Sequence, residues 1–464
     1  MFYKNKEDTI VALSTALGVG SIAIVRISGP LGLSIINKLV KKKINEQDSH
    51  KVFYRVLHSL KNGNSIIDQI MVTFFRAPNS YTGQDLVEIS CHCNPLIVNN
   101  IIEEILSQGA RIAEPGEFTW QAFMNNKIDL SQAEAVSDVI HSRTQQGLNQ
   151  SIRHLEGKLS QKINEIKDEI LGYLSLMEIN LDFSDEEIEA IPFSQLKAKI
   201  FETIQNLKRL ESTFDYGRLI QNGIRLLITG KPNVGKSSLL NLLLGKERAI
   251  VSNIPGTTRD YIEENMVIDG IAVNAVDTAG IRDTDDPIEE MGVERTIKQI
   301  HMSDIVLCMF EAHSELVEDD IKLLDLIDNY IPGNNAIFLL NKIDLGINQK
   351  TLETLSKQEY PIVQTSTTEN QGIKTLLKEI KTLLLKDQSL ETEEIVITSS
   401  RHRDIIKKTI KHLEDSFETI KINVSEEIVA IDLRLSLEKL GEITGETSTE
   451  DILNHVFSNF CIGK

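Results

Sequence analysis

The chain has 464 residues, 41% of them hydrophobic and 25% charged, which is typical of globular proteins but too long for a single hydrophobic core. No apolar run approaches the roughly 18 to 20 residues that span a bilayer, and four cysteines are too few for a disulfide framework, so we expect a soluble, cytoplasmic protein with no membrane span. The net charge of −19 argues against non-specific coating of nucleic acid, because such binding depends on lysine and arginine.

The first predicted domain, residues 1–125, belongs to the α+β class. Short runs rich in β-branched residues predict strands at 21–26, 69–75 and 86–91, and a helical pattern spans 95–107.

Two helical blocks flank the middle of the chain. From Gln145 to Leu174, apolar residues recur at spacings of four and three, which predicts one long helix with a continuous apolar stripe. The second block has helical patterns at 401–417 and 432–440. Neither block has an obvious partner within itself, so we expect the two to pack on each other. They would form one helical domain built from two segments, 126–220 and 386–464.

Between these blocks, residues 221–385 alternate short apolar runs with helical patterns. This alternation is typical of a parallel α/β sheet, here inserted into the helical domain. The predicted strands are 225–229, 271–276, 305–310, 336–340 and 362–364.

A phosphate-binding loop follows the first of these strands. The sequence GKPNVGKS, from Gly230 to Ser237, fits the P-loop pattern and precedes a predicted helix at 238–244. Its glycines allow backbone N–H groups to turn toward phosphates, while Lys236 reaches the β- and γ-phosphates and Ser237 binds Mg²⁺. The sequence therefore predicts a Ras-like P-loop domain.

Further GTPase motifs follow in the expected order. The sequence GTTRD at 256–260 offers Thr258 as a second Mg²⁺ ligand, and DTAG at 277–280 ends a strand, which directs Asp277 toward the metal and the Gly280 N–H toward the γ-phosphate. The full predicted GTP site comprises Asn233, Val234, Gly235, Lys236, Ser237, Ser238, Ser252, Asn253, Ile254, Pro255, Gly256, Thr257, Thr258, Asp277, Thr278, Ala279, Gly280, Asn341, Lys342, Asp344, Ser366, Thr367 and Thr368.

The base is predicted to be guanine. The sequence NKID at 341–344 ends a strand, and the carboxylate of Asp344 can accept hydrogen bonds from the guanine N1–H and 2-amino groups, a donor pair that adenine lacks. Ser366 and Thr367 follow the last strand and suit a loop that supports the base, although GTPases usually have alanine at the second position.

Ile281 leaves the catalytic set incomplete. In Ras-like enzymes a glutamine at this position orients the attacking water, and isoleucine cannot accept a hydrogen bond. Another group must therefore act, and carboxylates within 283–294 are the candidates.

Several blocks outside these motifs resemble the tRNA uridine 5-carboxymethylaminomethyl modification GTPases. With the GTPase motifs they cover nearly the full chain in family order. The blocks are DTIVA at 8–12, IVRISG at 24–29, YTGQDLVE at 81–88, PGEFT at 115–119, NKIDL at 126–130, QAEAV at 132–136 and the terminal CIGK at 461–464.

The resemblance implies a folate-binding N-terminal domain, a central helical domain and a homodimer joined through the N-terminal domains. It also implies a flavin-dependent partner, with which the GTPase forms a heterotetramer and adds a (carboxymethyl)aminomethyl group to C5 of the wobble uridine of certain tRNAs. Two alternatives remain. The G domain alone resembles ribosome-assembly or regulatory GTPases equally well, whereas a stand-alone folate aminomethyltransferase would give the GTPase motifs no purpose.

The resemblance further implies a K⁺ ion beside the nucleotide when G domains dimerise, where it neutralises charge as an arginine finger would. Its matching ligands are Asn233, Ser252, Ile254 and Thr257. The family's water-orienting glutamate precedes a GxER segment by three residues, which assigns the role to Glu289 rather than to its neighbour Glu290. With Lys236 and Thr258, Glu289 completes the catalytic set.

For folate, the matching positions are Arg26, Glu88, Lys127 and Lys464. A carboxylate suits the amino-pyrimidine edge of a pterin, and cations suit the glutamyl carboxylates of 5-formyl- or methylene-tetrahydrofolate. Two loops depart from the family pattern. Residues 16–20 are ALGVG where the family usually has PPGRG, and residues 92–94 are HCN where it usually has HGG.

The cysteines raise two further questions. Cys91-His92-Cys93 has no second ligand pair with zinc spacing, so we expect buried thiols at a strand end. Cys461, close to Lys464, is either a reactive thiol at the one-carbon site or a packed apolar side chain.

Overall fold

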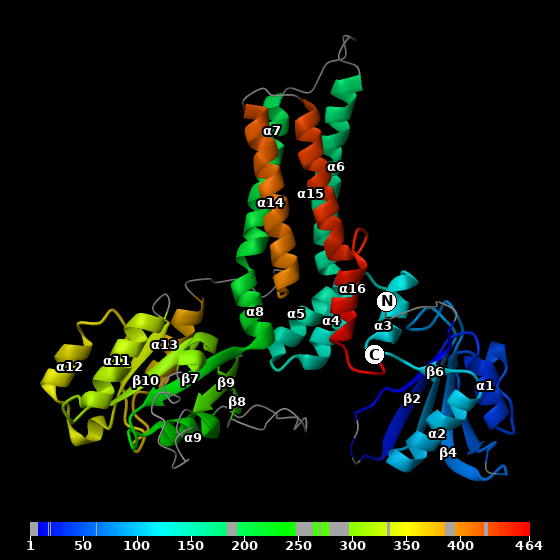
Figure 1. The fold of residues 1–464 in the computed structure, drawn as a ribbon, viewed down its shortest axis with the longest axis horizontal. Helices are drawn as coiled ribbons and strands as arrows, with labels where there is room; N and C mark the ends of the chain where they lie inside the picture. Colours follow the sequence, from blue (N-terminus) through cyan, green and yellow to red (C-terminus); the bar gives the residue numbers. More distant parts are fainter. Residues whose placement is uncertain are drawn as a thin grey trace. The chain divides into compact units, whose positions relative to one another are not determined.

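The computed structural model describes residues 8–16, 18, 20–61, 63–182, 193–246, 263–268, 271–277, 297–331, 335–385, 395–421 and 426–464 (Figure 1). The chain divides by its packing into two compact units. The first comprises Met1–Ile140, Ile152–Leu207 and Asp404–Lys464, and the second comprises His141–Ser151 and Lys208–Arg403.

A six-stranded sheet forms the N-terminal part of the first unit, in the order β3-β4-β5-β2-β1-β6. Neighbouring strands are antiparallel except for the parallel pair β1 and β6. The strands are β1 (Ile10–Leu13), β2 (Ile22–Ser28), β3 (Val52–His58), β4 (Ile66–Phe75), β5 (Leu86–His92) and β6 (Arg111–Ile112). The three predicted strands are confirmed as β2, β4 and β5, whereas β1, β3 and β6 were not predicted.

Helices α1 (Gly32–Leu39) and α2 (Pro95–Ser107) pack against this sheet, and α2 has the predicted bounds. Proline in the first turn and the side chain of Asn94, which accepts a hydrogen bond from the Leu96 N–H, define the start of α2. The side chains of Val25 and Ile89 point to the face of the sheet that these helices cover, and both are fully buried. The residues that alternate with them on β2 and β5, Arg26 and Glu88 among them, therefore point to the other face of the sheet.

The helical part of the first unit confirms that the two predicted blocks pack on each other. Helix α6 lies beside α15 (Figure 1), and Arg434 of α15 pairs with Glu178 of α6 at 2.6 Å. The helices of this region are α3 (Glu117–Met124), α4 (Leu130–His141), α6 (Lys158–Asp182), α7 (Phe193–Ser212), α14 (Ser400–Lys421), α15 (Glu426–Thr444) and α16 (Glu450–Ser458). Helix α5 (Gln145–Leu155) begins in the second unit and ends in the first.

The single long helix predicted from Gln145 to Leu174 is wrong, because the chain breaks between α5 and α6. Gly157 has a left-handed φ of +80°, which ends α5, and α6 begins at the next residue. The apolar spacing continues across the break in the sequence, but its burial changes there: Leu159 and Ile163 of α6 are fully buried, whereas Ile152 of α5 is 39% exposed. Hydrophobic spacing therefore revealed the buried face of α6 but not the backbone turn.

The second unit contains a six-stranded sheet in the order β12-β11-β10-β7-β9-β8. All neighbouring strands are parallel except the antiparallel edge strand β8. The strands are β7 (Ile224–Gly230), β8 (Glu263–Ile268), β9 (Ile271–Asp277), β10 (Ile305–Glu311), β11 (Ala336–Asn341) and β12 (Ile362–Gln364). All five predicted strands are confirmed, and β8 is an addition.

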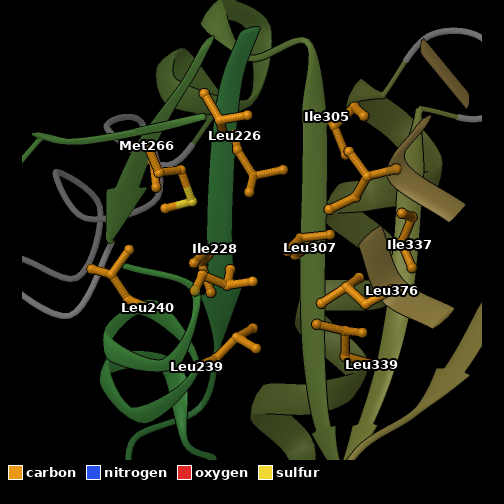
Figure 2. Close-up of a cluster of buried hydrophobic side chains, with 14 of the residues drawn as sticks. Leu226, Ile228, Leu239, Leu240, Met266, Ile305, Leu307, Ile337, Leu339 and Leu376 are labelled. Carbon is orange, nitrogen blue, oxygen red and sulfur yellow. The ribbon is translucent and has the colours of Figure 1, made fainter. Parts of the chain in front are cut away.

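Helices cover the two faces of this sheet, as its mostly apolar central strands require. Figure 2 shows the cluster on one face, where Leu226 and Ile228 of β7 and Leu307 of β10 meet Leu239 of α9 and Leu376 of α13. On the other face Phe310 and Phe338 pack with residues of α11. The helices of the unit are α8 (Phe214–Asn222), α9 (Lys236–Lys246), α11 (Glu318–Tyr330), α12 (Gln349–Leu355) and α13 (Ile373–Leu385).

The parallel strands β7, β9, β10 and β11 end at one edge of the sheet. The chain order reverses between β7 and β10, and open α/β sheets bind ligands at such a switch point, outside the carboxyl ends of the strands. The fold thus brings the loops that follow β7, β10 and β11 to one place.

Candidate functional site

The loop between β7 and α9 has the backbone geometry of a phosphate cradle. Gly230, Asn233 and Gly235 have φ values of +149°, +62° and +109°, which turn the chain tightly before α9 begins at Lys236. A side chain at position 235 would bring its Cβ within 2.3 Å of the Asn341 Nδ2 atom, so only glycine fits there.

Lys236 closes this loop. Its side chain is buried, and its Nζ donates hydrogen bonds to the carbonyl oxygens of Gly230 at 2.9 Å and Lys231 at 3.0 Å. The ammonium is thus held over the loop, at the N-terminus of α9, where the helix dipole also favours an anion.

Asn341 joins the P-loop to the loop after β12. It is fully buried, its Nδ2 donates to the Val234 carbonyl oxygen at 2.8 Å, and its Oδ1 accepts from the Thr367 N–H at 3.2 Å. Sequence reasoning assigned Asn341 to the nucleotide, and the structure gives it the additional task of fixing two loops against each other.

Asp344 stands where a guanine-recognising carboxylate is predicted. Its Oδ1 accepts a hydrogen bond of 2.6 Å from the Ser366 hydroxyl, and Ser366 in turn lies 3.0 Å from the Thr368 hydroxyl. The bond from Ser366 lowers the pKa of Asp344, which keeps the carboxylate ionised and able to accept hydrogen bonds.

Glu311, at the end of β10, was not predicted as a site residue. Its Oε2 lies 3.0 Å from the Lys231 Nζ, and its Oε1 lies 2.5 Å from the Lys342 Nζ. Although burial favours the protonated form, hydrogen bonds from Lys342 and Lys231 lower the pKa of Glu311 to about 2. The sequence feature that could have identified Glu311 is its position at the carboxyl end of a predicted central strand.

Part of the predicted GTP site lies outside the described residues, including two of its three catalytic residues. Asp277 closes β9, as expected from its motif. The predicted residues that are not described are Ser252, Asn253, Ile254, Pro255, Gly256, Thr257, Thr258, Thr278, Ala279, Gly280 and Glu289, together with Ile281 and Glu290.

In the N-terminal sheet, the structure brings Arg26 and Glu88 together. They are cross-strand partners on β2 and β5, and the Arg26 Nε and Nη2 donate to the Glu88 Oε1 at 3.0 and 2.7 Å. The rings of Tyr81 and Phe118, from two of the family-like blocks, lie 5.6 and 5.7 Å from the guanidinium. Among the described residues, both hydrogen bonds to the Glu88 carboxylate go to Oε1, which leaves its second oxygen available to a ligand.

The C-terminal tail reaches the same pair. The Phe118 N–H donates to the Lys464 carbonyl oxygen at 3.2 Å, and the Ser14 hydroxyl donates to the Gly463 carbonyl oxygen at 3.1 Å. Burial and the neighbouring Arg26 lower the pKa of Lys464, while Glu88 acts in the opposite sense. Phe118 also lies beside the Arg26 guanidinium, so the docked tail places Lys464 with Arg26 and Glu88 in one charged cluster, although they come from the two ends of the chain.

Lys127 and Cys461 complete the comparison with the predicted folate set. The Lys127 Nζ donates to the Pro78 carbonyl oxygen at 3.1 Å, so its described contact is with the loop before Tyr81 and not with Arg26 or Glu88. Cys461 is exposed, so it is not a packed apolar side chain.

The two loops that depart from the family pattern contact each other. The Cys93 Sγ donates to the Gly18 carbonyl oxygen at 3.3 Å, and its Cβ and Sγ lie under 4 Å from the Cβ position of Gly20. Cys91 is buried, whereas Cys93 is only partly buried, so the prediction of buried thiols holds for Cys91 alone.

Replacing Gly463 by alanine should release the tail. Its φ is +93°, which disfavours residues with a side chain, and a Cβ would lie 2.2 Å from the Leu13 carbonyl oxygen. We expect carboxypeptidase to remove the C-terminal residues about tenfold faster, as a loss of about 1.4 kcal/mol in docking would produce. The neighbouring Ile462, 57% exposed, provides the control: Ile462→Ala should leave the rate unchanged. Equal rates for Gly463→Ala and the unmodified chain would contradict the docking.

The parallel sheet, the P-loop and the loop that carries Asp344 define this protein as a P-loop GTPase. Its GTPase (G) domain is inserted into a helical domain. Two family models match the chain: the GTP-binding protein TrmE N-terminus matches residues 9–127, and the MnmE helical domain matches residues 130–461, a range that spans the G domain as well. The chain belongs to the MnmE family of tRNA modification GTPases.

Full-length relatives support this membership. The tRNA modification GTPase MnmE of Alkaliphilus oremlandii is 38% identical over 99% of this chain and 99% of its own length. The MnmE of Thermoanaerobacter pseudethanolicus is 42% identical over 98% of this chain and 99% of its own length. Among solved structures, the G domain of the T. maritima FeoB iron transporter covers 34% of this chain with 24% identity and a TM-score of 0.27.

None of the described helices is both long enough and apolar enough to cross a membrane.

Proposed function

We propose that this protein hydrolyses GTP and, with a flavin-dependent partner, adds a (carboxymethyl)aminomethyl group to C5 of the wobble uridine of certain tRNAs, using a folate one-carbon unit. The observation that carries the proposal is the Arg26–Glu88–Lys464 cluster, a charged site in the same chain as the P-loop. A GTPase that acts only as a switch has no use for such a site.

In the GTP half of the proposal, Lys236 exchanges its bonds to the P-loop carbonyl groups for the β- and γ-phosphates, and Asp344 accepts the guanine donors. Mg²⁺ would be held by Ser237, at the start of α9, and by Thr258. This metal would supply charge neutralisation at the phosphates. Glu289 orients the attacking water, since Ile281 cannot.

K⁺ is proposed beside the nucleotide, with Asn233, Ser252, Ile254 and Thr257 as ligands. Among these, Asn233 is described, and its left-handed φ of +62° fixes it at the turn of the phosphate cradle. An asparagine carbonyl oxygen is a ligand of the type that hard monovalent cations accept.

In the folate half, the free oxygen of Glu88 accepts the amino-pyrimidine edge of the pterin, and Arg26 orients that carboxylate. Lys464 and Lys127 supply positive charge for the glutamyl carboxylates. The aromatic rings of Tyr81 and Phe118 beside Arg26 fit a flat heterocycle. The exposed thiol of Cys461 is proposed to lie at the one-carbon site.

The proposed assembly is a homodimer joined through the N-terminal domains, extended to a heterotetramer by the flavin-dependent partner and acting on tRNA in the cytoplasm. Large apolar side chains exposed on β3 and β4 support a contact through this sheet. Val52, Tyr54 and Met71 are 59%, 56% and 43% exposed, and Tyr54 and Met71 are directly paired.

Nucleoside analysis of tRNA tests the modification activity. Purified tRNA that lacks the modification should gain it when incubated with the protein, the flavin-dependent partner, GTP and methylene-tetrahydrofolate, and should remain unmodified when folate is omitted. Modification that proceeds equally without folate would refute the proposed use of a folate one-carbon unit.

The rate of GTP hydrolysis should depend on the monovalent cation. With K⁺ bound beside the phosphates, the transition-state charge is stabilised as by an arginine finger, and we expect a rate at least about tenfold higher in KCl than in NaCl. Asn233→Ala should abolish this difference. Equal rates of the unmodified chain in both salts would remove K⁺ from the proposal.

A further inference from the structure

We propose that Glu311 is a positioning residue for guanine recognition, which it serves by tying the P-loop to the NKID loop through two lysines. This inference rests on the proposed GTP site and assigns it a component that the GTPase motifs do not contain. Glu311 touches neither the phosphates nor the base in this proposal and acts through Lys342.

The sheet places Glu311 between the two loops. β10 pairs on one side with β7, where Met309 is opposite Gly230, and on the other side with β11, where Glu311 is opposite Asn341. Because neighbouring strands are about 4.8 Å apart, the loops that follow β7 and β11 are separated by two strand spacings. Glu311, which ends β10, therefore lies between these two loops.

One carboxylate makes both connections. Its two oxygens accept from different loops, Oε2 from Lys231 of the P-loop and Oε1 from Lys342 of the NKID sequence. The two lysines would repel each other without this anion between them. All three side chains are at most 30% exposed, so solvent screens these contacts less than those of surface ion pairs.

The two connections are unequal. Lys231 has a second anionic partner, since its Nζ also lies 3.4 Å from the Oδ2 atom of the buried Asp320. Lys342 is paired with Glu311 and stands in a left-handed conformation, with φ of +66°, which disfavours residues with a side chain. Its peptide leads directly into the short helix Ile343–Leu345, which carries Asp344.

Loss of Glu311 should therefore disturb the base end of the site more than the phosphate end. Lys231 would keep Asp320, whereas Lys342 would lose the contact that holds its strained backbone and, with it, the position of Asp344. Inosine triphosphate separates the two ends, because it has the same phosphates as GTP but lacks the 2-amino group that Asp344 accepts.

The test compares the binding of GTP and inosine triphosphate to the full-length chain and to Glu311→Gln. A charge-assisted hydrogen bond to the 2-amino group should give the unmodified chain a preference for GTP of about 10- to 100-fold. In Glu311→Gln, we expect the Kd for GTP to rise about tenfold and that for inosine triphosphate about twofold, so that the preference falls about fivefold.

Two further variants keep the test decisive if Glu311→Gln folds poorly. Lys342→Met removes the lysine that pairs with Glu311 and should lower the preference for GTP as much as Glu311→Gln does. Lys231→Met should leave this preference unchanged. Combining Glu311→Gln with Lys342→Met should reduce the preference no further than either change alone, as expected for residues that act as one unit.

Glu315→Gln is the matched control. Glu315 forms an ion pair of 3.0 Å with Lys350 in the same unit, but these side chains are 65% and 82% exposed, and neither residue belongs to the P-loop or to the NKID sequence. This variant should bind both nucleotides as the unmodified chain does.

Equal weakening of both nucleotides by Glu311→Gln, or no weakening at all, would overturn the role of Glu311 while leaving the GTP site intact. Failure of the unmodified chain to bind GTP would instead refute the proposed GTP site itself, so the two failures are distinguishable.

Discussion

Lys236→Ala should lower kcat/KM for GTP hydrolysis at least about 10³-fold. Its ammonium is buried over the P-loop and bonded to the carbonyl oxygens of Gly230 and Lys231, so the positive charge is positioned before the nucleotide arrives. The charge that develops on the phosphates during hydrolysis would then meet a fixed cation. A phosphate-release assay at saturating and limiting GTP measures this loss.

Lys350→Ala serves as the control for charge. This lysine belongs to the same unit but is 82% exposed, so its loss removes one positive charge without touching the P-loop. It should leave kcat/KM within a factor of about two, as expected for an exposed side chain. A Lys236→Ala protein that hydrolysed GTP at the normal rate would show that the loop is not the catalytic one.

Arg26→Ala should weaken binding of 5-formyl-tetrahydrofolate at least about 10²-fold and abolish tRNA modification in the assay with the flavin-dependent partner. The reason is positional, since both hydrogen bonds that orient the Glu88 carboxylate come from Arg26. Calorimetry with the folate measures the affinity, and GTP hydrolysis by the same preparation should be unchanged.

Lys51→Ala is the matched control for Arg26→Ala, because it also removes one positive charge from the N-terminal domain. Lys51 is 63% exposed and pairs with Asp48 on the surface, so its replacement should affect neither folate affinity nor modification. Folate affinity that survives in Arg26→Ala would refute the proposed pterin site. Loss of GTP hydrolysis in this variant would indicate general unfolding instead.

The sequence-based prediction was most accurate where the signal is local. Helix α2 and strand β12 have their predicted bounds, and the P-loop lies between a strand and a helix as its pattern requires. These features depend on apolar spacing, on glycines and on capping residues a few positions apart. The same local signal failed at Gly157, because an apolar stripe continues through a backbone turn that it cannot detect.

The sequence by itself determined the five parallel strands of the second unit and the P-loop, and it predicts Asp344 as the guanine-recognising carboxylate, because each of these depends on neighbours along the chain. Only the tertiary structure decided that the tail with Lys464 docks on Phe118, whose ring lies beside Arg26, and that Glu311 joins Lys231 to Lys342. Those contacts depend on strand order and on how the tail docks. A carboxylate at a strand end gains its partners only when neighbouring strands bring their loops beside it.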